Sequence, residues 1–284
     1  MSFKRKTALA LVILLVVLSC CVMFSCEAAP DNTILPDVPP DTIPDEDNPT
    51  GNIDVNPDEC APKEALYATL STMNKSIGFR SECTGKTTAK RSFITYDQNF
   101  IGCTVKNGNS FYNESYSTSR FVNVRHESFS QGDKICYRKN RGDIEVNSRE
   151  DYVEIYGITP DKLLCGYLLN DQTIVSAEFV GEENGLYTFR YALSKDLAHA
   201  LLVKQMKQFG GLNSYPVFTQ DTVITLTITK NYVPVSLTTL SNYNINVAIL
   251  DEMNCNESMT VNFVEFNVNS VIPDIDDFTA ACVE

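Results

Sequence analysis

The feature that most limits the fold is a repeated alternation of apolar and polar residues between short turn sequences. From residue 78 to residue 141, the stretches SFITYDQNF, SFYNESYS, RFVNVRHESF and DKICYRK are rich in threonine, tyrosine, phenylalanine and valine, which is typical of half-buried β-strands. Asn107-Gly108 predicts a tight hairpin, because its turn requires positive φ at both central positions. Gln131–Asp133 and Asn140–Asp143 predict further turns, so this region should form an antiparallel meander.

Strand patterns return in the second half of the chain. TIVSAEFV and LYTFRYAL flank a turn at Glu183–Gly185, and TVITLTIT is followed by a turn at Lys230–Tyr232. VPVSLTTLSNYNINVAIL and SMTVNFVEFNV predict two more strands, which we expect a turn at Cys255–Glu257 to join. The last residues, Pro273–Glu284, predict an acidic tail.

Three segments predict helices. Pro62–Asn74 has apolar residues at helical spacing behind a first-turn proline. Thr159–Leu168 begins with a capping residue, a proline and an acid, as short helices often do. Ser194–Phe209 gives the clearest signal, because a serine caps its start and two glycines follow its end. Its apolar stripe is wide enough to cover a sheet face and includes Leu197, Ala198, Leu201, Leu202, Met206 and Phe209.

This order of elements predicts an α+β domain: a strongly curved antiparallel β-sheet, or half-barrel, with helices packed on its concave face. The arrangement resembles the half-barrel of bacterial lipoprotein carriers and lipid-binding lipoproteins of the LolA and LppX type. The resemblance covers residues 60 to 278 and depends on the strands TVITLTIT, VPVSLTTLSNYNINV and SMTVNFVEFN and the ending VIPDIDDF. It implies a cavity for acyl chains between sheet and helices, with a wall formed by Leu197, Leu201, Leu202, Met206 and Phe209.

The N-terminal residues 1–26 predict export. Three basic residues, Lys4 to Lys6, precede the run TALALVILLVVLSCCVMFSC, which has the pattern of a signal peptide. Two sites, ending at Cys20 and Cys26, resemble the lipobox in which a bacterial lipoprotein is lipidated on cysteine. Cys26 is favoured, because the apolar run continues to Phe24 and the polar chain starts after it. Ordinary secretion or an uncleaved membrane anchor is the alternative interpretation.

Residues 27–59 predict an extended spacer. They contain ten acidic residues, no lysine or arginine, and seven of the twelve prolines. Such a segment buries too little apolar surface to offset the entropy of ordering it. The predicted organisation is therefore a signal peptide (1–26), a disordered acidic spacer (27–59) and one domain (60–284), tethered to the outer face of a bacterial cell membrane. Much of the net charge of −13 belongs to this spacer, but the rest of the chain is also acidic and lacks a basic stripe, which argues against a nucleic-acid partner.

No motif predicts catalysis, a cofactor or a metal. Thr84–Thr88 resembles the end of a phosphate-binding loop but lacks the glycine that would stand at position 80. His126 and His199 have no second histidine at metal-ligand spacing. The tripeptide Arg141-Gly142-Asp143 is explained by a turn. Two carboxylate pairs fall in expected turns or tails, namely Glu182/Glu183 and Asp276/Asp277.

The leading functional hypothesis is a non-catalytic lipoprotein that binds a lipid or another apolar ligand. The alternative is a structural or adhesive surface protein with a fully packed core, because the 15 phenylalanines and 13 tyrosines suit either a cavity wall or a core. A secreted hydrolase would instead need converging carboxylates in a polar cleft. Seven cysteines follow Cys26, so the sequence leaves the presence of a disulfide open.

Overall fold

The structure is a computed structural model that describes residues 55–120, 123–159, 167–210, 212, 214–247, 251–272 and 276–283. The predicted signal peptide with Cys20 and Cys26, nearly all of the spacer and most of the expected helix at 159–168 lie outside these residues.

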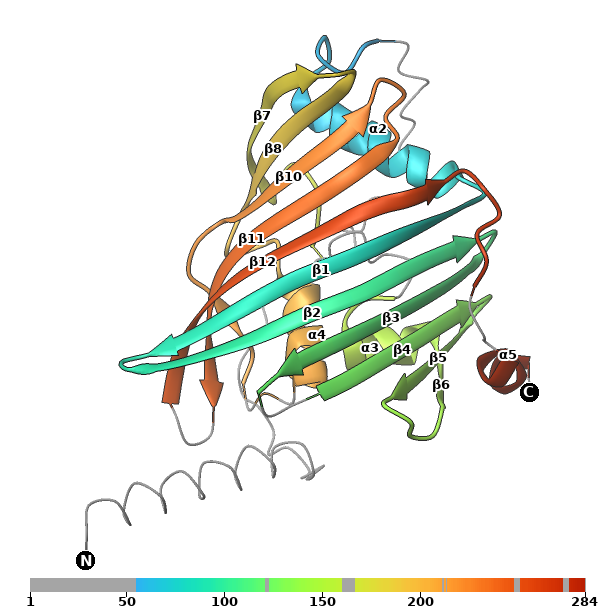
Figure 1. Cartoon of the computed structure of the whole chain (residues 1–284), viewed down its shortest axis with the longest axis vertical. Coiled ribbons are helices and arrows are strands. Elements are labelled where there is room, and N and C mark those ends of the chain that lie inside the picture. Colours follow the sequence, from blue (N-terminus) through green and yellow to red (C-terminus); the bar gives the residue numbers. More distant parts are fainter. Residues whose placement is uncertain are drawn as a thin grey trace, which may run out of the picture.

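The domain is built on one antiparallel sheet of twelve strands that does not close into a barrel (Figure 1). The strand order is β6-β5-β4-β3-β2-β1-β12-β11-β10-β8-β7, with β9 paired to β11. The first and last strands therefore lie side by side in the middle of the sheet. The strands are β1 (Gly78–Arg91), β2 (Ile94–Asn107), β3 (Ser110–Ser119), β4 (Asn123–Gln131), β5 (Lys134–Lys139), β6 (Glu145–Ser148), β7 (Ile174–Glu183), β8 (Leu186–Leu193), β9 (Val217–Phe218), β10 (Thr222–Thr229), β11 (Pro234–Val247) and β12 (Asp251–Phe266).

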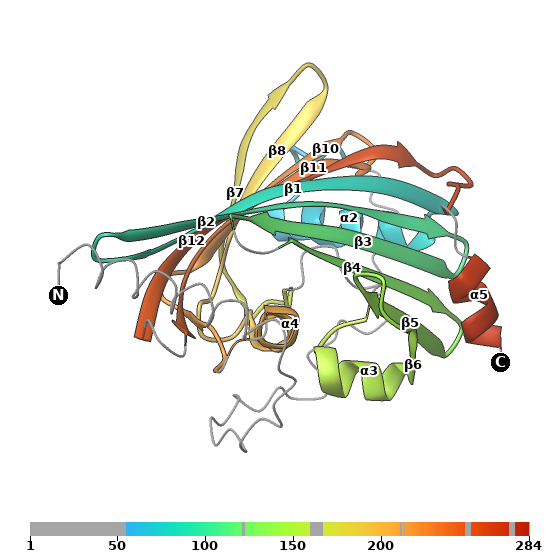
Figure 2. The same cartoon turned by 60° about the horizontal axis from the view of Figure 1, so that its bottom comes forward.

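The sheet is strongly curved, and three helices lie on its concave side: α2 (Pro62–Lys75), α3 (Arg149–Tyr156) and α4 (Ala200–Gly210) (Figure 2). This confirms the predicted fold class. Strand β10 shows how the sequence determines which side of the sheet is covered, because its residues alternate regularly between buried and half-buried. The buried apolar residues of β10 pack with α2 in the largest core cluster, which includes Ala65, Leu66, Ile224, Leu226 and Leu237.

The predicted turns form where residues can adopt positive φ. Gly108 and Gly132 have φ of 58° and 61° in the β2–β3 and β4–β5 hairpins. Asn184 and Gly185 turn β7 into β8, and Tyr232 lies in the turn before β11. The predicted helix at Pro62–Asn74 is also confirmed and ends one residue later.

The expected turn at Cys255–Glu257 is wrong, because these residues lie in the middle of β12. Cys255 pairs with Tyr243 of β11 and with Ala89 of β1, so both neighbours hold it in the sheet. Alternation explains the result: Cys255 is buried, Asn256 is exposed and Glu257 is half-buried, as in a strand with one covered face.

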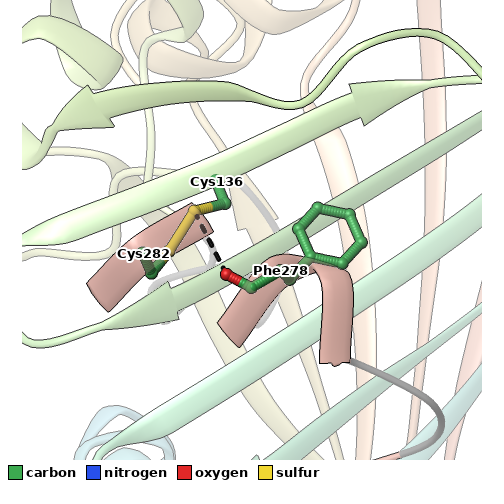
Figure 3. Close-up of a disulfide and its surroundings, with 3 residues drawn as sticks. All are labelled: Cys136, Phe278 and Cys282. Carbon is green, nitrogen blue, oxygen red and sulfur yellow. Dashed lines mark hydrogen bonds between the residues drawn. A yellow bond between two sulfur atoms is a disulfide. The ribbon is translucent and has the colours of Figure 1, made fainter. Parts of the chain in front are cut away.

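The expected acidic tail is also wrong for its described residues, which form helix α5 (Asp276–Val283). This helix packs on the convex face: Ile135 points to α3, whereas the next residue, Cys136, lies in a cluster with Phe278 and Cys282. A disulfide joins Cys136 to Cys282, and the Cys136 sulfur lies 3.8 Å from the carbonyl oxygen of Phe278 (Figure 3). Burial of Phe278 and this cross-link hold a short helix that would be marginal alone.

One helix starts later than predicted, and another helix was not predicted. Helix α4 begins at Ala200 rather than near Ser194. Residues 195–199 form a turn, and the carbonyl oxygen of Ala198 accepts a hydrogen bond from the backbone N–H of Leu168, which belongs to a distant segment. Helix α3 was not predicted at all. The sequence does contain a signal for its start, a serine at position 148 followed by two acids in the first turn. In the structure the Ser148 side chain accepts a hydrogen bond from the backbone N–H of Asp151, as a helix N-cap does.

Candidate functional site

The candidate site is the middle of the concave face, where β12, β1 and β2 lie side by side. Cys83 faces Gly102 on one neighbouring strand and Val261 on the other, and Gly85 faces Phe100 and Met259 in the same way. Directly paired residues share a face of the sheet. We call these six half-buried residues the concave strip: Cys83, Gly85, Phe100, Gly102, Met259 and Val261.

The two ends of β1 are fully covered, whereas the concave strip between them is only partly covered. At one end Phe79 is 6% exposed, and at the other end Ala89 is 4% exposed. Ala89 belongs to a cluster with Val203 of α4, and Leu202 and Met206 pack against that cluster. The concave strip is thus a partly exposed stretch of apolar and small side chains between covered regions of the same face.

Glu257 lies at the border between the concave strip and the cluster under α4. Its Oε2 accepts hydrogen bonds from the hydroxyls of Thr87 and Tyr243, each at 2.8 Å. Burial and the Glu257 carboxylate together raise the pKa of Cys83 to about 11 and that of Cys255 to about 12. Both thiols are therefore protonated at neutral pH, which makes them poor nucleophiles.

His199 belongs to a buried hydrogen-bond chain. Its Nδ1 lies 3.2 Å from the carbonyl oxygen of Lys195, so this nitrogen carries the proton and Nε2 accepts from Thr222 at 2.8 Å. Thr222 then accepts from Ser241, and Ser241 from Tyr167, each at 3.1 Å. Burial lowers the pKa of His199 to about 4, so the neutral ring ties the start of α4 to β10 and β11.

His126 has a separate structural environment. Its Nδ1 lies 2.7 Å from the hydroxyl of Tyr137, and its ring centroid lies 4.7 Å from that of Phe209. Burial, with a smaller effect of Lys139, lowers its pKa to about 4. Within the described ranges, no three histidine, cysteine or acidic residues are arranged to hold a metal ion.

The five predicted wall residues do not line one common surface. Leu202 and Met206 pack against the concave face beside the concave strip. Phe209 lies in another cluster with Tyr137 and Tyr156. Leu201 is half-buried, and Leu197 precedes α4 and is 48% exposed.

Sequence reasoning missed Cys83 and Glu257 as members of the site. The signal for Cys83 was available, because its alternation with Arg80 and Glu82 places it on the same face as Phe79. Glu257 was missed because its segment was interpreted as a turn.

The remaining motifs have local structural roles. Thr84–Thr88 lies in the extended strand β1. The backbone N–H of Gly185 donates to the Glu182 carboxylate in a hairpin turn, and Asp277 forms an ion pair with Arg138 at 3.5 Å. Arg141–Asp143 is an exposed turn between β5 and β6. None of the helices in the described ranges is long and apolar enough to cross a membrane.

No protein-family model and no curated protein matches the chain. Among solved structures, the chain is similar to an outer membrane lipoprotein-sorting protein domain from Vibrio parahaemolyticus, with 11% identity, a TM-score of 0.28, and coverage of 77% of this chain and 97% of that one. The ywiB protein from Bacillus subtilis shows 6% identity, a TM-score of 0.21, and coverage of 66% and 92%. An N-terminal dehydratase from the difficidin assembly line shows 11% identity, a TM-score of 0.13, and coverage of 76% and 85%. Because these TM-scores are low, the half-barrel assignment depends on the sheet order and the helix positions alone.

Proposed function

We propose that residues 60–284 form one domain of an extracytoplasmic bacterial lipoprotein, and that this domain binds a lipid or another apolar ligand on the concave strip without catalysing a reaction. The lipid anchor is Cys26 or Cys20, and the spacer at 27–59 separates the domain from the membrane. Leu202 and Met206 of α4 form the edge of the ligand site, together with the concave strip.

The observation that carries this proposal is the incomplete cover of one face. Phe100, Met259 and Val261 point to the concave side and are half-buried, although the same face is closed at both ends of β1. Contact between apolar surface and water is unfavourable, so binding of an apolar ligand that covers this surface is favourable. Ligand sites are concave and mainly apolar, as this strip is.

The extracytoplasmic location has independent support. The Cys136–Cys282 disulfide fits an oxidising compartment, because disulfides are rare in the cytosol. The predicted signal peptide points in the same direction. Labelling with a palmitate analogue tests the anchor. Wild-type protein should be labelled, and one of the two variants Cys26→Ala and Cys20→Ala, the one that removes the anchor cysteine, should lose the label. Wild-type protein without label would refute the lipoprotein assignment.

A matched pair of variants tests the ligand site. Cys83→Phe places a large ring on the concave strip, whereas Thr84→Phe places the same ring on the opposite face of the same strand. Native mass spectrometry of the extracted full chain should detect a bound apolar molecule in the wild type and in Thr84→Phe. Cys83→Phe should lose it while keeping its melting temperature close to that of Thr84→Phe.

The structural or adhesive alternative makes the opposite prediction. If the chain only forms a surface scaffold, extracted wild-type protein is consistently empty, and Cys83→Phe changes nothing but stability. Empty wild-type protein from several extractions would therefore favour the scaffold and overturn the binding proposal.

A further inference from the structure

Glu257 is a charged side chain beside the apolar concave strip. Thr87 faces it on β1, and Met259, a strip residue, lies two positions further along the same face of β12. Tyr243, which contacts the Glu257 carboxylate, packs in the cluster under α4. The carboxylate therefore lies where the covered part of the concave face meets the partly exposed strip.

The hydrogen bonds of Glu257 leave half of the carboxylate unused. Both hydroxyl donors, Thr87 and Tyr243, reach the same oxygen, Oε2. Among the described residues, no side chain donates to Oε1, and no lysine or arginine forms an ion pair with Glu257. Oε1 is also not one of the buried polar atoms that lack a partner, so it is not sealed inside the protein.

A carboxylate in this position favours a cation. The two hydroxyls fix its orientation, but hydroxyls donate hydrogen bonds without supplying a compensating positive charge. A half-buried charge next to apolar surface is costly until it is paired, and hydrogen bonds between charged groups are stronger than those between neutral groups. An ammonium group supplies both the charge and the donors that Oε1 lacks.

We infer that Glu257 binds the ammonium head group of a cationic amphiphile whose hydrocarbon chain lies on the concave strip. This inference rests on the proposed function, because it assigns the ligand class of the same site. Dodecylammonium is the simplest probe, and dodecanol and dodecanoate are matched probes with the same chain and a neutral or a negative head group.

Displacement of the neutral fluorescent probe N-phenyl-1-naphthylamine from the full chain, below the concentrations at which the amphiphiles form micelles, tests the inference. In the wild type, dodecylammonium should displace the probe at a concentration about tenfold lower than dodecanol, and dodecanoate should be the weakest competitor. Glu257→Gln should remove the preference for the ammonium. Glu252→Gln, an exposed acid on the same strand, should keep it.

The outcomes separate the inference from the proposed function. If the three amphiphiles displace the probe equally well from the wild type, the inference is refuted but apolar binding stands. The same conclusion follows if the preference persists in a folded Glu257→Gln variant. If the fluorescent probe does not bind at all, the proposed function fails first. The comparison of amphiphiles uses the wild type, so it decides the inference even if Glu257→Gln does not fold.

Discussion

The ammonium group of Lys106 donates a hydrogen bond of 2.7 Å to the carbonyl oxygen of Ser76, just past the end of α2. The same ammonium donates to the carbonyl oxygens of Met73 and Asn74, at 3.2 and 2.8 Å. These carbonyls lie at the helix C-terminus, where intrahelical donors run out and a positive charge is favourable. Burial lowers the pKa of Lys106, and the three carbonyls take the place of the water that a buried ammonium loses.

Replacing Lys106 by methionine should therefore destabilise the domain by about 2 kcal/mol, because three carbonyls lose a charged donor. Urea unfolding followed by circular dichroism measures this change. Lys86→Met is the control, since Lys86 is exposed and its ion-pair partner among the described residues is Asp97 on the convex face. Its effect should stay below about 1 kcal/mol. Equal losses in the two variants would show that the contacts with α2 contribute nothing.

The disulfide predicts a second stability difference. It links residues that are 146 positions apart, and cross-links of long loops typically contribute about 2–4 kcal/mol. Cys282→Ser should lower the unfolding free energy by that amount and release α5 from the convex face. Hydrogen exchange of residues 276–283 should then become fast, while exchange in α4 stays slow.

The control for this experiment is Cys83→Ser, which removes a thiol that is not part of a disulfide. It should leave exchange in α5 unchanged. If α5 stays protected in Cys282→Ser, burial of Phe278 and the Arg138 contact are sufficient to hold the helix.

The sequence predicted the strands and hairpins well, because their signals are local. The alternation in TVITLTIT and the positive-φ residues of the turns need no information from distant parts of the chain. Helix α3 and the strand at Cys255–Glu257 were missed although their signals are local, whereas the C-terminal helix depends on a distant contact. The tail at 276–283 is helical because Phe278 and Cys282 meet β5, and no local pattern shows that contact.

Two of the predicted wall residues lie beside the candidate site, whereas its other members needed long-range information. Leu202 and Met206 follow from the helical stripe, which is a local pattern. Cys83 and Glu257 lie near each other on one face of the sheet only because β1 pairs with β12, and these strands are separated by more than half of the chain. The strand order of the sheet, rather than any motif, brings the candidate site together.

The buried histidine of the α4 network predicts a dependence of stability on pH. Burial lowers the pKa of His199 from its ordinary value of 6.5 to about 4, although the hydrogen bond to the Lys195 carbonyl and the charges of Asp221 and Asp196 oppose the shift. The unfolded chain therefore binds a proton between pH 6.5 and 4 while the folded protein does not. Stability from this group is complete above pH 6.5, falls on acidification through that window by roughly 3 kcal/mol, and is level below pH 4.

Thermal unfolding of the wild type and of His199→Gln across this pH range checks the prediction. The variant should be less stable at pH 7, because it loses the imidazole ring that stacks on Phe218, but its melting temperature should depend less on pH. His126 contributes in the same direction, so some slope should persist in the variant. Identical slopes in the two proteins would contradict the assignment to His199.

The thiol of Cys83 offers a direct report on the concave strip. Its pKa of about 11, raised first by burial and then by Glu257, predicts slow alkylation by iodoacetamide at pH 8 and a rate that increases up to about pH 11. Glu257→Gln removes the negative charge that opposes the thiolate, so alkylation at pH 8 should become faster. A bound amphiphile should slow it again by covering the strip. Peptide mass spectrometry of the modified cysteines measures all three rates, and a rate that no amphiphile changes would show that such ligands bind elsewhere.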